Sequence, residues 1–204
     1  MKHKFFTCIC AVVLVIALLL AGCSNNQAAL GPSNHSKYAS ALGLSKEEAC
    51  KVIGIQPEDM TEYVIETFST PLKAELAGQT FEVNLSFNAL SEEEELLQII
   101  YRAIYSDLSI TTVEAVNAIA SALEEQYGEP SRRNDSGDED EQIPKGYTYW
   151  DLTETASQEL SAYMKQLEKE YGGTAYYELV LHVNPYDDTC VVDVSYVVGV
   201  TPAK

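Results

Sequence analysis

Two stretches of alternating apolar and polar residues near the end of the chain restrict its fold more than any other feature. They span 175–184 and 190–198, and the segment between them, 184–188, contains a proline and two aspartates. Because successive side chains of a strand point to opposite faces, alternation places the apolar residues on one face. The sequence therefore predicts a long β-hairpin with one buried face and one exposed face.

Three further regions are predicted to be strands. Alternation is clear at 80–88, and β-prone residues occupy 63–68 and 147–152. Residues 96–105 are ambiguous, because their apolar residues fit helical spacing and also alternate. The strand that precedes them favours a strand for 96–105.

Three helices are predicted from apolar residues that recur at helical spacing. Each begins with two residues at capping-box spacing, which lets side chains satisfy unpaired N–H groups of the first turn, and each is followed by glycine. The helices and their capping pairs are 45–53 (Ser45, Glu48), 111–127 (Thr111, Glu114) and 155–171 (Thr155, Gln158).

These elements predict an α+β fold, an antiparallel sheet with helices packed on one face. Helices and strands do not alternate in the βαβ manner, which argues against a doubly wound nucleotide-binding fold. We expect a single domain over 41–204. Its halves, 41–108 and 109–204, each begin with a capped helix and continue into strands, which suggests a tandem repeat of a helix-plus-strands unit.

The N-terminus has the features of a secretion signal. A basic start is followed by an apolar run, 8–21, which is shorter than the about 20 residues that a membrane-spanning helix needs. A signal peptide is therefore predicted at 1–22, with an uncleaved anchor as the alternative. The polar segment that follows, 23–40, is predicted to be a flexible tether.

The residues at this junction, Leu20-Ala21-Gly22-Cys23, resemble the lipobox of bacterial lipoproteins. The resemblance implies cleavage before Cys23 and a diacylglycerol on its thiol. Acyl chains contribute about 0.8 kcal/mol per buried methylene, so two or three of them hold a protein on a membrane. The expected location is the cell membrane or outer membrane, facing outside the cytoplasm. An ordinary secretory signal is the alternative.

The chain is strongly acidic, with 13 Lys and Arg against 31 Asp and Glu and a formal net charge of −18. Removal of 1–22 takes Lys2 and Lys4 away and changes the balance to 11 − 31 = −20. Nucleic-acid binding is not expected, since it needs clustered Lys and Arg. Anionic lipid headgroups would repel the same charge, so the lipid on Cys23 has to supply membrane attachment.

Candidate catalytic groups are few. His182 is the histidine of the predicted domain, on the outward face of its strand, and neither a G-x-S-x-G motif nor a glycine-rich phosphate loop accompanies it. Two carboxylates could act as they do in glycosidases, but among 31 acidic residues such a pair is not specific. We therefore expect a protein that is not an enzyme and has no cofactor.

Two candidate binding sites follow from composition and strand position. Tyr147, Tyr149 and Tyr176 are expected on an open face of the sheet, where aromatic side chains favour recognition. The edge of the core is the alternative place for them. The polar loop 131–142 contains carboxylates that could collect a cation, although EF-hand spacing is absent and a solvated loop is the alternative. These carboxylates are Asp135, Asp138, Glu139, Asp140 and Glu141.

Cys50 and Cys190 are the cysteines of the predicted domain. Outside the cytoplasm they could form a disulfide, and two buried free thiols are the alternative. The sequence leaves both alternatives open, because pairing depends on the distance between the two residues.

The order of elements resembles a known architecture. The resemblance lies in a helix that ends at Tyr127-Gly128-Glu129-Pro130, a strand that contains Tyr149-Trp150, and the long hairpin. It is similar to the tandem helix-plus-sheet modules of the β-lactamase-inhibitor-protein-like class and to the small lipoprotein of the outer-membrane barrel-assembly machinery. Such modules bind proteins or assist envelope assembly and are not enzymes. The resemblance implies an architecture and no functional residues.

Together these features predict a membrane-tethered extracytoplasmic lipoprotein that acts as a non-catalytic protein-binding or envelope-assembly module. The expected partners are the membrane, through Cys23, and an envelope protein or peptide. The alternative is a lipoprotein that binds a small molecule, a glycan or a cation. A hydrolase is a third and weaker alternative.

Overall fold

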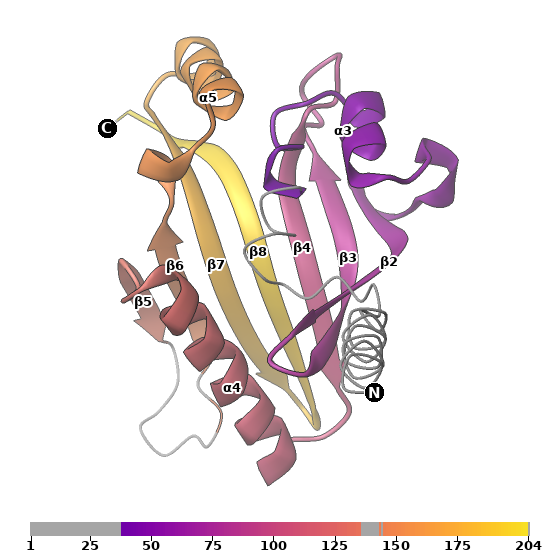
Figure 1. Ribbon diagram of the computed structural model, residues 1–204, viewed down its shortest axis with the longest axis vertical. Coiled ribbons are helices and arrows are strands. Elements are labelled where there is room, and N and C mark those ends of the chain that lie inside the picture. The colour runs from indigo at the N-terminus through magenta and orange to yellow at the C-terminus, as the bar shows by residue number, and fades with distance from the viewer. Residues whose placement is uncertain (1–37, 136–142, 144, 204) are drawn as a thin grey trace, which may run out of the picture.

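The computed structural model describes residues 38–135, 143 and 145–203. Within them, eight strands form one antiparallel sheet in the order β1-β2-β3-β4-β8-β7-β6-β5, with helices α3, α4 and α5 packed against it (Figure 1). The predicted α+β fold is confirmed. The strands are β1 (Thr61–Val64), β2 (Thr67–Leu76), β3 (Gln79–Phe87), β4 (Leu96–Tyr105), β5 (Arg132–Asp135), β6 (Gly146–Asp151), β7 (Thr174–Tyr186) and β8 (Thr189–Thr201). The helices are α3 (Lys46–Ile53), α4 (Ile110–Tyr127) and α5 (Gln158–Tyr171), with short 3-10 turns η1 (Pro57–Asp59) and η2 (Thr153–Thr155).

Each half of the chain contributes one contiguous half of the sheet. Strands β1 to β4 are neighbours in space, as are β5 to β8, and the halves meet where β4 pairs with β8. This pairing runs from Gln98 opposite Val197 to Tyr105 opposite Cys190 in a single register. Each half, 41–108 and 109–204, therefore contributes antiparallel strands to one continuous sheet and helical structure that packs against it.

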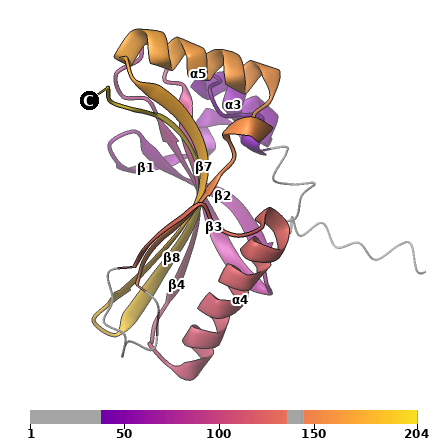
Figure 2. The ribbon, with the colours of Figure 1, turned by 90° about the vertical axis from the view of Figure 1, so that its left-hand side faces the viewer.

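The helices cover one face of the sheet and leave the other face open (Figure 2). Apolar side chains of α3, α4 and α5 form one core with the inward-facing side chains of the strands. Tyr101, Phe81 and Leu85 are among its largest fully buried side chains. Trp150 is buried as well, and its indole N–H donates to the carbonyl of Gly128 at 2.9 Å, which fixes β6 to the end of α4.

The predicted strand faces are confirmed. Phe81, Val83, Leu85 and Phe87 are all buried on β3. The ambiguous segment 96–105 is strand β4, as its neighbour in sequence favoured. The C-terminal hairpin is longer than predicted, since β7 and β8 extend to Tyr186 and Thr201.

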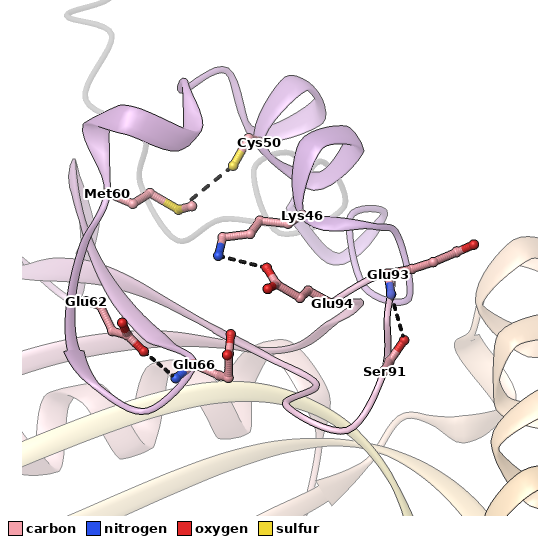
Figure 3. A network of polar contacts seen from close by, with 8 residues as sticks. All are labelled: Lys46, Cys50, Met60, Glu62, Glu66, Ser91, Glu93 and Glu94. Atoms are coloured by element: carbon pink, nitrogen blue, oxygen red, sulfur yellow. Dashed lines mark hydrogen bonds and ion pairs between the residues drawn. The ribbon is translucent and has the colours of Figure 1, made fainter.

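The prediction of one continuous β segment at 63–68 is wrong. Ile65 and Glu66 form a turn between β1 and β2, and Glu66 has a positive φ of 53°. The N–H of Glu66 donates to Glu62 Oε1 at 2.9 Å, which supports the turn (Figure 3). A turn that lacks Gly, Pro, Asn and Asp gives little signal in the sequence.

The predicted loop 131–142 is wrong at its start, where Arg132–Asp135 forms β5 and pairs with β6. This strand is polar because it lies at the edge of the sheet. Of the predicted cation ligands, Asp135 ends β5, and Asp138, Glu139, Asp140 and Glu141 lie outside the described residues.

The predicted capping pairs are wrong in detail. Helix α4 follows Ser109, so Thr111 lies inside the helix. Helix α5 follows Ser157, whose hydroxyl oxygen accepts from the N–H of Leu160 at 3.1 Å, and Thr155 belongs to η2. Ser45 does precede α3, but its hydroxyl donates to the Glu48 carboxylate at 3.1 Å and makes no bond to the backbone of the first turn.

The folded part begins earlier than predicted. Tyr38 is only 9% exposed and packs on Tyr101, with ring centroids 6.5 Å apart, so the predicted tether 23–40 is too long at its end. The predicted signal peptide and Cys23 lie outside the described residues. Of the helices in the described part of the chain, none is both long and apolar enough to cross a membrane.

The two cysteines of the domain are free and buried, and no disulfide joins them. The thiol of Cys50 donates to Met60 Sδ at 3.8 Å (Figure 3), and burial raises the pKa of both Cys50 and Cys190.

In the same region Lys46 fixes α3 to the loop before β4. Its ammonium lies 2.8 Å from Glu94 Oε2.

Gly43 is predicted to tolerate no side chain. It has a φ of 79°, and a Cβ atom there would lie 2.6 Å from Cδ1 of Tyr163 on α5. Gly43→Ala should lower the free energy of unfolding by about 2–4 kcal/mol, through backbone strain and overpacking together. Gly78→Ala, with a φ of 74° and no atom within 4 Å, should lower it by about 1 kcal/mol through strain alone. Urea denaturation measures both, and equal losses would contradict the packing of Gly43 on α5.

Candidate functional site

The open face of the sheet is hollowed across four neighbouring strands. A hollow of ≈ 370 Å³ is lined by outward-facing side chains of β4, β8, β7 and β6. We call these side chains the open-face site: Gln98, Ile100, Arg102, Tyr147, Tyr149, Tyr176, Glu178, Val180, His182, Asp193, Ser195 and Val197. Strand alternation selects them, because their sequence neighbours point into the core.

An arginine–aspartate pair holds the centre of this face. Arg102 on β4 and Asp193 on β8 are cross-strand partners. The Arg102 Nε and Nη2 atoms donate to the two carboxylate oxygens of Asp193, each at 2.8 Å. These hydrogen bonds with Asp193 raise the pKa of Arg102. Such a two-pronged pair fixes both side chains and stabilises the junction between the halves of the sheet.

His182 continues this row across β7. It lies opposite Asp193 on one side and opposite Tyr147 on the other. Its ring stacks on Tyr147 with centroids 4.1 Å apart and planes 3° from parallel. Burial lowers the pKa of His182, while Asp193 raises it and Arg102 lowers it, with a net lowering. The lowered pKa favours the neutral form of the imidazole, whose ring offers a flat surface.

The ring stack continues along β6, the neighbour of the edge strand β5. Tyr147 and Tyr149 are stacked with centroids 6.0 Å apart. The guanidinium of Arg132 on β5 lies 3.8 Å from the centroid of the Tyr149 ring, and its Nη2 lies 3.5 Å from Glu178 Oε1. A cation held over an aromatic ring and near a carboxylate is a favourable arrangement.

Tyr176 completes the aromatic part of the site from β7. It packs over Gly199 on β8, where a Cβ atom would lie 2.6 Å from the Tyr176 hydroxyl oxygen. Glycine at this position therefore allows Tyr176 to lie against the sheet. Burial raises the pKa of Tyr176, and Glu178 adds to the increase.

The structure brings the predicted aromatic residues together. Tyr147, Tyr149 and Tyr176 all line the open-face site, while their role in binding a partner stays a prediction. Sequence reasoning missed the charged pairs Arg102 with Asp193 and Arg132 with Glu178. Alternation could have placed Arg102, Asp193 and Glu178 on the outer faces of their strands, but it gives no signal for Arg132 on the polar strand β5. The order of strands β4, β8, β7, β6 and β5 is not readable from local patterns.

Within the part of the chain that the structure describes, no group of three or more His, Cys, Asp or Glu side chains is arranged to hold a metal ion. The open-face site instead presents stacked rings, apolar side chains and internally paired charges. These features are suited to contact with another surface.

No protein-family model, curated protein or solved structure matches this chain. Its fold and site define its class: an α+β protein with one helix-covered face and one open face that carries an aromatic and charged hollow.

The Arg102–Asp193 pair is predicted to stabilise the fold. Arg102→Met leaves the carboxylate of Asp193, whose side chain is 13% exposed, without its cation. The free energy of unfolding should fall by about 2–3 kcal/mol. Lys73→Met removes the exposed Lys73–Glu82 pair and should cost less than about 1 kcal/mol. Similar losses for both variants in urea denaturation would contradict the structural role of Arg102.

His182 is predicted to make the protein less stable in mild acid. Because its pKa is lower in the folded chain than in the unfolded chain, the unfolded chain takes up a proton first as the pH falls below about 6.5. Between pH 7.5 and pH 5.5 the wild type should lose more unfolding free energy than His182→Gln. Glu178, whose pKa is raised, acts with the opposite sign in both proteins and cancels in the comparison. An identical pH dependence would contradict the neutral, stacked imidazole.

Proposed function

We propose that this chain is a lipid-anchored extracytoplasmic protein that binds another envelope protein or peptide through its open-face site. The sequence Leu20-Ala21-Gly22-Cys23 supports the anchor by its resemblance to a lipobox. The open face supports the binding role. The chain then acts as a non-catalytic recognition or envelope-assembly module.

The single observation that carries this proposal is the gathering of three tyrosines in one hollow on the face that no helix of the described residues covers (Figure 2). Tyr147, Tyr149 and Tyr176 supply large contact areas with few rotatable bonds, which lowers the entropy cost of binding. The surrounding apolar side chains, such as Ile100 and Val180, add area that a partner can remove from water.

The site extends over four strands, and the rings of Tyr147, Tyr149, Tyr176 and His182 are part of its surface. Rows of outward side chains on an antiparallel sheet match a peptide or a protein surface that is itself flat or extended. Binding of a small molecule, a glycan or a cation is the alternative, and it predicts no captured protein in the experiment below.

We predict that a photo-crosslinking amino acid at position 98, in the open-face site, captures a specific envelope protein in intact cells. Tyr147→Ser combined with Tyr176→Ser should remove most of this capture, because the aromatic contact area is lost. Tyr186→Ser is the matched control, since Tyr186 is 69% exposed at the far end of β7 and outside the site. The same captured band in the double variant and the control would overturn the proposed surface.

We also predict that Cys23→Ala releases the protein from membranes and abolishes incorporation of a labelled fatty acid. The wild type should stay in the membrane fraction after a high-salt wash, because acyl chains and not charge hold it there. A wild-type chain that takes up no fatty acid, or a variant that stays bound, would overturn the anchor.

A further inference from the structure

The end of the open-face site at Glu178 borders two further charged residues, Asp151 and Arg132. Asp151 on β6 and Glu178 on β7 are cross-strand partners. Asp151 acts on Glu178 strongly enough to contribute to its raised pKa. Arg132 is the cation that pairs with Glu178, and it does so at 3.5 Å. Arg132 therefore pairs with the Glu178 carboxylate, while the Asp151 carboxylate accepts from the N–H of Thr153.

Glu178 is also poorly solvated for a carboxylate. Its side chain is 20% exposed, whereas the side chain of its partner Arg132 is 58% exposed. Burial is the main cause of the raised pKa of Glu178, and Arg132 lowers it only in part. A carboxylate that has lost water and has one distant ion pair gains from a second cation.

Aromatic rings border these carboxylates. The guanidinium of Arg132 already lies 3.8 Å from the centre of the Tyr149 ring, so this corner of the sheet binds a cation within the chain itself. Tyr176 is close enough to Glu178, Tyr149 and Arg132 for each of them to influence its pKa. Tyrosine rings beside a carboxylate are suited to bind an arginine or lysine side chain.

The remaining charges of the open face do not oppose an incoming cation. Arg102 is paired with both oxygens of Asp193, and Lys73 is paired with Glu82. Over the whole chain, 31 acidic residues face 13 basic ones. Such a field attracts positively charged partners and speeds their encounter.

From these contacts we infer that the partner presents an extended basic segment, with an Arg or Lys side chain placed against Tyr176 beside Glu178 and Asp151. This inference rests on the proposed function, because it assigns the chemistry of the partner to the same face. An extended segment fits because its alternate side chains point to one side and repeat at about 6–7 Å, close to the spacing of outward residues along a strand.

The inference is tested with the full-length lipidated protein in a neutral detergent at about 0.15 M salt, which screens distant charges. The probe is a blocked heptapeptide, Gly-Arg-Ser-Arg-Ser-Arg-Gly, and its counterpart has citrulline in place of arginine. Calorimetry should show at least about fivefold tighter binding of the arginine peptide. Glu178→Gln combined with Asp151→Asn should weaken that binding by at least about fivefold.

The matched control combines Glu125→Gln on α4 with Glu159→Gln on α5, which removes the same two charges from exposed positions on helices. Asp151→Asn keeps a side-chain oxygen that can accept a hydrogen bond from the N–H of Thr153, which lies 2.9 Å from Asp151 Oδ1 in the wild type. Thermal unfolding confirms that both double variants are folded. Binding should be unchanged in the control.

Three results would overturn the inference: equal binding of the citrulline peptide, equal weakening in both double variants, or displacement of the arginine peptide by a neutral oligosaccharide or a second copy of the chain. The proposed function fails separately. Suppose that Glu178→Gln with Asp151→Asn still captures the envelope protein in cells, whereas Tyr147→Ser with Tyr176→Ser does not. The open-face site is then still the binding surface, and the inference that the partner is basic is wrong.

Discussion

The pairing of β4 with β8 is the constraint on which the rest of this structure depends. It joins strands from the two halves of the chain in one register, from Gln98 opposite Val197 to Tyr105 opposite Cys190. On the helix-covered face of the sheet, the inward residues of β4 and β8 form part of the core. On the open face, the same register places Arg102 opposite Asp193, and Asp193 in turn lies opposite His182. Because a shift of one residue would exchange the two faces of a strand, the register determines both the core and the open-face site.

Much of the fold follows from local patterns. Alternation predicts strands β3, β4, β7 and β8, since each has one face in the core, and helical spacing predicts α3, α4 and α5. The failures have physical causes. The turn at Ile65 and Glu66 uses a positive φ without glycine, and β5 is polar because it is a short edge strand. The observed starts of α4 and α5, after Ser109 and Ser157, differ from the predicted starts. Several serines and threonines near each start are suitable caps, so the sequence does not single out one of them.

The site was predictable only in part. The outward positions of Tyr147, Tyr149 and Tyr176 follow from the parity of their strands. The partners of these tyrosines do not, because contacts between Arg132 and Tyr149, or between Arg102 and Asp193, depend on which strands are neighbours. Strands far apart in sequence, such as β4 and β8, become neighbours through the whole topology. Alternation therefore predicts where the open face lies, but the contacts between its side chains depend on the pairing of strands that are distant in sequence.

The central claim is that a partner covers the open-face site in the cell. Hydroxyl-radical footprinting of intact cells and of the purified full-length protein, read by mass spectrometry, tests this directly. The account predicts slower oxidation of Tyr147 and Tyr176 in cells than in the purified protein. Tyr186, which is exposed outside the site, should be oxidised at the same rate in both. Equal oxidation of Tyr147 and Tyr176 in the two samples, or protection of Tyr186 alone, would contradict the claim.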